Sequence, residues 1–379
     1  MSTNYENVKN WILNSGLVIT DEQNENSGGV YSFFDNKNQK YGFLYPEIVG
    51  YSISAFCFLH QIENEEKYLK LAKSSSDWLI GIFEKFGGII QGLDDENDSR
   101  KQFAYSFDTA ICAKGILDCY NLTQDKRYLE FSQSLVKWLE DAISDQGKIF
   151  PFMELKSKKF NESDDVWYKK WGCLHIKSSM IFGQLYKITN ENKYLDYAEK
   201  ICNTFTKFQN TDGSFSLNEN SKIINLHTMA YALEGLFYVY NITKNEKYLQ
   251  SVEKGLDWCT NKIAEDGSIS LWFNSKYNSK AMYPIAQIIR LMILNDKFHD
   301  KNKYLKSILK LRIFLVSLQA NDNNKKTNGG FYEEFYKSLF GWKKREKLNS
   351  WGSLFAMQAL YWFDNYEKIN FNESILSLY

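Results

Sequence analysis

Two carboxyl groups stand near the start of apolar, small-residue-rich segments of this 379-residue chain: Glu47 in the run Tyr-Pro-Glu and Asp108 in the run Ser-Phe-Asp. Enzymes that break glycosidic bonds use such a pair, one group to protonate the leaving oxygen and the other to activate water. A structural interpretation competes, because aspartate caps helices and glutamate stabilises a first helical turn. Glu47 and Asp108 are therefore candidate catalytic groups, with capping as the alternative.

A histidine at a comparable position adds a third acid–base candidate, since a pKa of about 6.5 suits proton transfer. His227 opens an apolar segment, and Tyr231, one helical turn later, would orient the imidazole or act as a second acid. His175 is placed similarly one repeat earlier. A hydrogen-bonded core histidine is the alternative for both.

Repeats of about sixty residues position these groups. Lys-Tyr-Leu or Arg-Tyr-Leu recurs after short polar turns, and an aromatic residue ten positions later lies on the same helical face in four of the five copies. A glycine turn then ends each of these segments. Between the copies lie six more apolar segments that we expect to be buried helices: 46–62, 108–122, 173–188, 227–241, 284–297 and 351–366.

Five outer segments accompany six inner ones, and the sixth outer segment is Asn4 to Ser15 at the other end of the chain. A closed ring explains this arrangement, because an open stack leaves the apolar faces of its terminal repeats in water. We predict one all-α domain, 1–379, folded as an (α/α)6 barrel that the N-terminal helix closes, with short β-like segments after the outer helices. An open α-solenoid is the alternative, but its repeats are shorter, at ~34 to 47 residues.

In such a barrel the first turns of the inner helices surround one mouth. Aromatic rings beside hydroxyl and carboxyl groups suit the faces of sugar rings, although aromatic residues also fill cores. The candidates for substrate binding are Tyr45, Tyr105, Trp171, Trp272, Tyr283 and Trp351.

Charge and motifs exclude several classes of function. Lys and Arg number 46, as do Asp and Glu, so no overall field recruits nucleic acid. No apolar run is long enough to span a membrane, and the first residues lack the features of a signal peptide, which predicts a cytoplasmic location. The six cysteines form no CxxC pair and are expected to be free thiols. Nucleotide, zinc-protease and serine-hydrolase motifs are missing, so we expect no metal or cofactor.

An acidic run, residues 94–98, spells DDxxD, the pattern with which prenyl-transfer enzymes bind diphosphate through magnesium. The run follows a glycine turn, and no second Asp-rich motif occurs in the chain. A solvated loop is therefore the competing interpretation.

The Tyr-Leu, Asp-Gly-Ser and inner-helix motifs resemble, over nearly the whole chain, the six-hairpin toroid superfamily of unsaturated glucuronyl hydrolases, sugar 2-epimerases and polysaccharide lyases. Residues 45–51 and 226–231 look most like toroid proteins of surface-polysaccharide gene clusters. The resemblance implies the fold and a glycan substrate. The uronide hydrolases use two aspartates, of which only Asp108 has a match here, and the epimerases use two histidines, for which His175 and His227 are the only matches.

Three hypotheses follow. The first is an enzyme acting on an acidic polysaccharide or oligosaccharide by hydrolysis, β-elimination or epimerisation, with carboxylate and histidine acid–base catalysis. The second is a non-catalytic scaffold that binds a glycan or a protein partner. The third is a prenyl-diphosphate or terpene cyclase-like enzyme. The sequence leaves the oligomeric state open.

Overall fold

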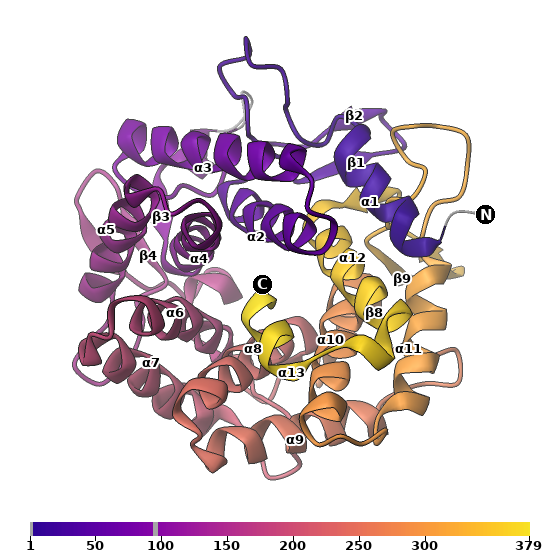
Figure 1. Ribbon diagram of the computed structural model, residues 1–379. Helices are drawn as coiled ribbons and strands as arrows, with labels where there is room; N and C mark the ends of the chain where they lie inside the picture. Colours follow the sequence, from indigo (N-terminus) through magenta and orange to yellow (C-terminus); the bar gives the residue numbers. More distant parts are fainter. Residues whose placement is uncertain (1–2, 94–97) are drawn as a thin grey trace.

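The computed structural model describes residues 3–93 and 98–379, which form two concentric rings of helices (Figure 1). The inner ring holds α2 (Pro46–Glu63), α4 (Ser106–Thr123), α6 (Ser179–Thr189), α8 (Leu226–Thr243), α10 (Met282–Phe298) and α12 (Ser350–Asp364). The outer ring holds α1 (Asn4–Asn14), α3 (Glu66–Phe86), α5 (Lys126–Ala142), α7 (Asn192–Phe205), α9 (Glu246–Asn261) and α11 (Leu305–Ser317). The predicted (α/α)6 barrel is confirmed.

The two rings differ as their sequences predict. Inner helices are apolar on all sides and almost wholly buried, whereas outer helices such as α5 and α7 bury one face only. Four inner helices end at a residue in the left-handed conformation, which turns the chain back towards the outer ring: Asn64, Gln124, Asn190 and Lys244.

The third inner helix begins differently from the expected 173–188 helix. Residues Cys173–Ser178 form a 3₁₀ helix, η3, and the α-helix α6 starts only at Ser179. A 3₁₀ helix has fewer residues per turn than an α-helix. The side chains of His175 and Lys177 therefore point in directions that an α-helix would not give them.

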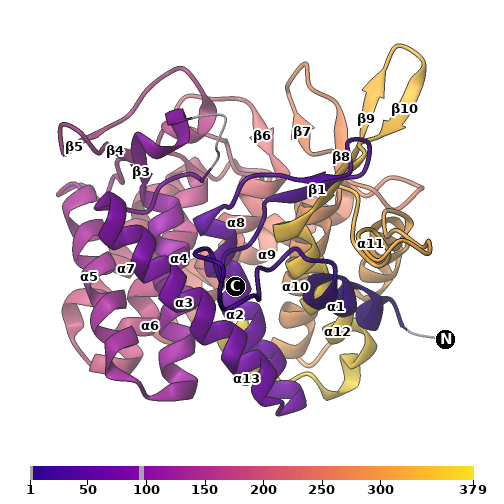
Figure 2. The ribbon, with the colours of Figure 1, turned by 90° about the horizontal axis from the view of Figure 1, so that it is seen from above.

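Short strands lie together on one face of the barrel, beside the first turns of the inner helices (Figure 2). Three sheets have three strands and one has two. The strands are β1 (Phe33–Asp35), β2 (Lys40–Tyr41), β3 (Phe103–Tyr105), β4 (Phe152–Glu154), β5 (Lys159–Asn161), β6 (Ile224–Asn225), β7 (Trp272–Phe273), β8 (Ser279–Ala281), β9 (Glu334–Ser338), β10 (Gly341–Lys344) and β11 (Lys347–Asn349). We call this side the mouth face.

The ring closes where the two ends of the chain meet. Helix α1 packs beside α12, and β1 pairs antiparallel with β11, with Phe33 opposite Asn349. The indole Nε1 of Trp11 donates to the Lys326 carbonyl oxygen at 2.9 Å. The predicted closure by the N-terminal helix is therefore confirmed.

The last residues enter the ring from the side opposite the mouth (Figures 1 and 2). Helix α13 (Phe371–Ser374) and the 3₁₀ helix η6 (Ile375–Ser377) lead to Tyr379, which is 1% exposed. Its hydroxyl donates to the Leu354 carbonyl oxygen at 2.9 Å. This segment closes the ring on the side opposite the mouth, and we call it the C-terminal floor; the repeat pattern had not predicted it.

Two other sequence expectations can be compared with the structure. All six cysteines are free and buried, as expected. Among residues 3–93 and 98–379 no helix is both long and apolar enough to cross a membrane. The DDxxD run at 94–98 has its first four residues outside the described part of the chain.

Candidate active site

The first turns of the inner helices bring most of the predicted residues into one cluster below the mouth, in which Asp108 and Tyr231 are buried and Glu47 and His227 are partly buried. The His227 ring lies 4.2 Å from the Tyr231 ring and 4.6 Å from the Tyr283 ring, centroid to centroid. Tyr283 in turn lies 5.7 Å from Trp351. Burial, and then the charge of Glu47, raise the pKa of Tyr231, so the carboxyl group of α2 lies near α8. We call this set the central cluster.

Glu47 and Asp108 form a coupled pair of carboxyl groups in this cluster. Burial raises the pKa of Glu47 to about 7, although the Tyr45 hydroxyl and the Lys177 ammonium act in the opposite direction. Burial, and then the charge of Glu47, raise the pKa of Asp108 well above its ordinary value. Two carboxyl groups in one desolvated site do not both ionise readily, so the pair retains a proton near neutral pH.

Helix capping does not account for Asp108. The N-cap position of α4 belongs to Tyr105, and no side chain makes a capping hydrogen bond there. Asp108 Oδ2 is buried and has no hydrogen-bond partner in the described part of the chain. A buried carboxyl oxygen without a partner is costly to retain for stability alone.

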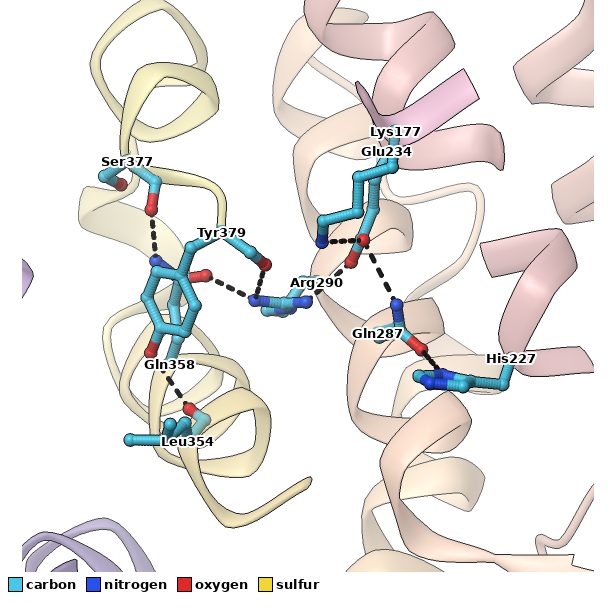
Figure 3. Close-up of polar contacts among 9 residues, drawn as sticks. All are labelled: Lys177, His227, Glu234, Gln287, Arg290, Leu354, Gln358, Ser377 and Tyr379. Atoms are coloured by element: carbon cyan, nitrogen blue, oxygen red, sulfur yellow. Dashed lines mark hydrogen bonds and ion pairs between the residues drawn. The ribbon is translucent and has the colours of Figure 1, made fainter. Parts of the chain in front are cut away.

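His227 is held by a second buried group of polar side chains (Figure 3). Its Nδ1 lies 2.6 Å from Gln287 Oε1, and Gln287 Nε2 donates to Glu234 Oε2 at 3.1 Å. Burial lowers the pKa of His227 to about 3; the hydrogen bond to Gln287 raises it, and the nearby cations Lys177 and Arg290 lower it further. His227 is therefore neutral at physiological pH.

Glu234 is the centre of that group. Lys177 Nζ lies 2.6 Å from Oε2 and Arg290 Nη2 lies 2.6 Å from Oε1, and all three side chains are fully buried. Arg290 Nη1 also donates to Gln358 Oε1 at 2.9 Å and to the Tyr379 carbonyl oxygen at 3.0 Å. The two buried ion pairs and the hydrogen bonds of Arg290 thus connect inner helices α8, α10 and α12 to the C-terminal floor (Figure 3).

The residue patterns did not predict this network, although the sequence contains a signal for it. A charged residue inside an otherwise apolar helix is rarely buried without a partner. Glu234 in Ala-Leu-Glu-Gly-Leu and Arg290 in Ile-Ile-Arg-Leu-Met have this pattern. Lys177 belongs to the same set, and its ammonium also lies over the Tyr231 ring, 4.7 Å from the centroid.

His175 lies apart from His227. It is 1% exposed, its ring packs 5.7 Å from the Phe205 ring of outer helix α7, and neither ring nitrogen has a hydrogen-bond partner among the described residues. Burial lowers its pKa to about 3. Among residues 3–93 and 98–379, no ring contact joins His175 to His227.

The predicted aromatic residues divide into two groups. Tyr45, Tyr105, Tyr283 and Trp351 belong to the central cluster or border it, and Tyr105 lies close enough to Asp108 for that charge to raise its pKa. Trp171 and Trp272 are on the rim. The Trp171 ring has the ammonium of Lys148 3.7 Å above it, while Trp272 packs on Trp167 and Tyr277.

Glu333 is a further carboxyl group that the sequence analysis missed. Burial raises its pKa to about 7, and the charge of Glu334 acts in the same direction, while Arg345 opposes them. Burial, and then the charge of Glu333, raise the pKa of Tyr283, so Glu333 lies near the side of the cluster that holds His227. No motif in the sequence around Glu333 marks it as a candidate.

A separate cavity lies on another part of the molecule. A groove of about 1270 Å³ runs between α3 and the loops on its mouth side, lined by charged side chains that include the Lys70–Glu22 ion pair. In the central cluster, two carboxyl groups with raised pKa values stand beside a histidine with a lowered pKa. The described residues contain no group of three His, Cys, Asp or Glu side chains that is suited to a metal ion.

Comparison with known proteins shows which solved structures have a similar fold. No protein-family model and no curated protein sequence matches the chain. Solved structures do match it. The cellobiose 2-epimerase of Bacillus thermoamylovorans B4167 superposes with a TM-score of 0.74 at 13% identity, covering 95% of this chain and 96% of the epimerase. A D-mannose isomerase gives 0.73 at 13% identity, covering 94% and 96%.

An unsaturated glucuronyl hydrolase specific for heparin gives a TM-score of 0.69 at 13% identity, covering 97% of this chain and 98% of the hydrolase. The class of fold is therefore the six-hairpin (α/α)6 toroid. These structural neighbours are carbohydrate-active enzymes, and at such identities the likeness establishes the fold alone.

Proposed function

We propose that the chain is a carbohydrate-active enzyme that acts on an acidic polysaccharide or oligosaccharide by acid–base catalysis in the central cluster. One observation carries the proposal: the first turns of α2, α4 and α8 bring Glu47, Asp108 and His227 into one cluster, where desolvation raises the pKa of both carboxyl groups and lowers that of the histidine. An acid and a base that coexist at neutral pH are what proton transfer requires.

The same groups suit three reactions of a sugar. In elimination, His227 removes the proton from the carbon beside a uronate carboxyl and the carboxyl pair protonates the departing glycosidic oxygen. In epimerisation, a proton leaves the carbon and returns to its other face. In hydrolysis, one carboxyl protonates the leaving oxygen and the other activates water.

The rim supports an acidic substrate. Lys148 lies over Trp171, and the ammonium of Lys169 lies 4.6 Å from the centroid of the Phe103 ring. Positive charge beside the aromatic residues of the rim would favour binding of a uronate over a neutral sugar.

Incubation in D₂O with uronate-containing and neutral oligosaccharides tests the proposal. We expect turnover of a uronate substrate, read by NMR. Deuterium at a ring carbon indicates epimerisation, a new double bond indicates elimination, and new reducing ends without either indicate hydrolysis. Glu47→Gln, Asp108→Asn and His227→Ala should each lower kcat by about 10² to 10⁴-fold.

His299→Ala is the matched control, because His299 lies at the far end of α10 and pairs with Glu253 on the outer surface. Full activity in all three cluster variants refutes the assignment. Saturable binding of an oligosaccharide that is recovered unchanged after long incubation instead supports the binding scaffold.

A further inference from the structure

We propose that Glu234, acting through Gln287, fixes His227 in the tautomer that carries its proton on Nδ1 and leaves the lone pair of Nε2 free. Glu234 and Gln287 are positioning residues in this proposal. Their catalytic meaning rests on the proposed function, whereas the tautomer itself is a property of the folded chain.

The orientation of the Gln287 amide follows from the ion pairs. Glu234 binds two cations at 2.6 Å each, so its carboxylate has only acceptor oxygens to offer. A carboxylate oxygen next to an amide accepts from the amide nitrogen and repels the amide oxygen. Gln287 must therefore direct Nε2 to Glu234 and Oε1 away from it, as the 3.1 Å hydrogen bond shows.

The tautomer follows from the amide. Gln287 Oε1 is a carbonyl oxygen, which only accepts, and it lies 2.6 Å from His227 Nδ1. Nδ1 must then donate. A neutral imidazole has one N–H, so Nε2 carries the lone pair and serves as the acceptor. None of the hydrogen bonds among the described residues engages Nε2.

The relay is also rigid. Gln287 and Glu234 are fully buried, and Arg290 is anchored beyond Glu234 by Gln358 and by the Tyr379 carbonyl oxygen. An amide cannot take a proton from the imidazole, so His227 would accept a substrate proton at Nε2 and keep its Nδ1 proton. Lys177 and Arg290 disfavour the resulting imidazolium, which would make it a strong acid for the return step.

The test is ¹⁵N NMR of the histidine side chains, of which the chain has four. We expect His227 in the wild-type protein to show a protonated Nδ1 and an unprotonated Nε2 from pH 6 to 8. Gln287→Leu should convert it to the other tautomer or to a mixture. Gln358→Leu is the matched control, since it removes a buried glutamine that touches Arg290 but neither Gln287 nor His227, and it should leave the tautomer unchanged.

A protonated Nε2 in the wild-type protein overturns the proposal, and so does a Gln287→Leu variant with an unaltered tautomer. The predicted tautomer together with full activity in His227→Ala retains the relay and rejects the proposed function. The two failures are therefore distinguishable.

A separate observation concerns the hairpin of β9 and β10, which projects from the mouth face (Figure 2). Its turn carries Leu339 and Phe340, which are 98% and 88% exposed. The turn does not require them, because the left-handed position falls on Gly341, with φ at 104°. Trp342 follows and is 40% exposed.

Cations surround this apolar tip. Lys343 lies 5.6 Å from the centroid of the Phe340 ring, and Lys337 lies 5.5 Å from that of Trp342. The chain as a whole has no net charge, so this is a local concentration. We infer that the tip docks on an anionic lipid surface, because an apolar tip with an aromatic residue and lysines behind it enters the interface while its cations meet anionic headgroups.

Co-sedimentation with phosphatidylcholine vesicles that contain or lack phosphatidylglycerol tests the docking. We expect binding only to the anionic vesicles, and at least a tenfold loss in Leu339→Ser/Phe340→Ser. Ile313→Ser is the control, since Ile313 is 67% exposed on the outer ring and should not matter. Equal binding by the double variant overturns the proposal, and so does a dimer in sedimentation that the double variant abolishes while vesicles are ignored.

Discussion

At the scale of single residues, the raised pKa of Glu47 makes the stability of the folded protein depend on pH. Its pKa is raised to about 7 in the folded protein, above the ordinary 4.5, so folding takes up a proton between these values. The contribution of Glu47 to the free energy of unfolding is therefore fully present at low pH, and it is lost as the pH rises through about 7. Above that value the folded protein bears the cost of a partly desolvated charge at Glu47.

Glu47→Gln should remove this cost. At pH 4.5 the free energies of unfolding of variant and wild type should be close, and at pH 8 the variant should be more stable by on the order of 3 kcal/mol, as 1.4 kcal/mol per pKa unit gives. Urea unfolding of both proteins at the two pH values measures this. A constant difference across the range would mean that Glu47 titrates normally.

Replacing Glu234 by glutamine should destabilise the protein, in contrast to the same change at Glu47. Glu234→Gln keeps the shape but leaves Lys177 and Arg290 buried without their anion, and breaking a buried pair costs about 3 to 5 kcal/mol. Urea unfolding at pH 7 should show that loss. A variant as stable as the wild type would show that the two cations find other partners.

Residue patterns predicted part of the site. Glu47, Asp108 and His227 could be found because each opens an inner helix and the repeat gives its position. Glu234 and Arg290 lie two to three turns further along their helices, and their partners come from other repeats. Their charges were visible in the sequence, but which charge meets which depends on the rotation of each helix in the closed ring.

At the scale of elements, the glycine turns show why the hairpins repeat. Gly267 has φ at 80°, and a Cβ there would lie 2.1 Å from the Lys310 carbonyl oxygen on the next outer helix. Gly213 has the same relation to Lys254. The turn that ends one outer helix is thus pressed against the backbone of the next, which sets the spacing around the ring.

Gly267→Ala should therefore destabilise the protein by about 1 to 3 kcal/mol, through strain and displacement of α11. Gly81→Ala is the control: Gly81 lies inside α3 with open space around it, and alanine there should be neutral or stabilising by up to about 1 kcal/mol. Melting temperatures of the two variants measure the contrast. Equal effects would mean that the turn does not set the spacing.

At the scale of the whole molecule, the count of inner and outer segments predicted a closed ring, and this was sufficient because only closure covers the apolar faces of the terminal repeats. The C-terminal floor was not predictable in this way. It belongs to no repeat, and its contacts with Arg290 and Leu354 depend on the width of the opening that the finished ring leaves.

Because the ring is closed, we expect it to unfold as one cooperative unit. The variant Trp11→Ala tests this expectation. Trp11 is 1% exposed and joins α1 to a segment 315 residues away, so its loss leaves a cavity at the seam and an unpaired carbonyl oxygen at Lys326. We expect a loss of about 3 to 5 kcal/mol. In a cooperative ring this loss lowers the temperature of a single transition, because opening the seam exposes the apolar faces of the repeats on both sides of it. If α1 instead only covers an open stack, circular dichroism and tryptophan fluorescence should show a first transition confined to the seam, with the remaining repeats melting at the wild-type temperature.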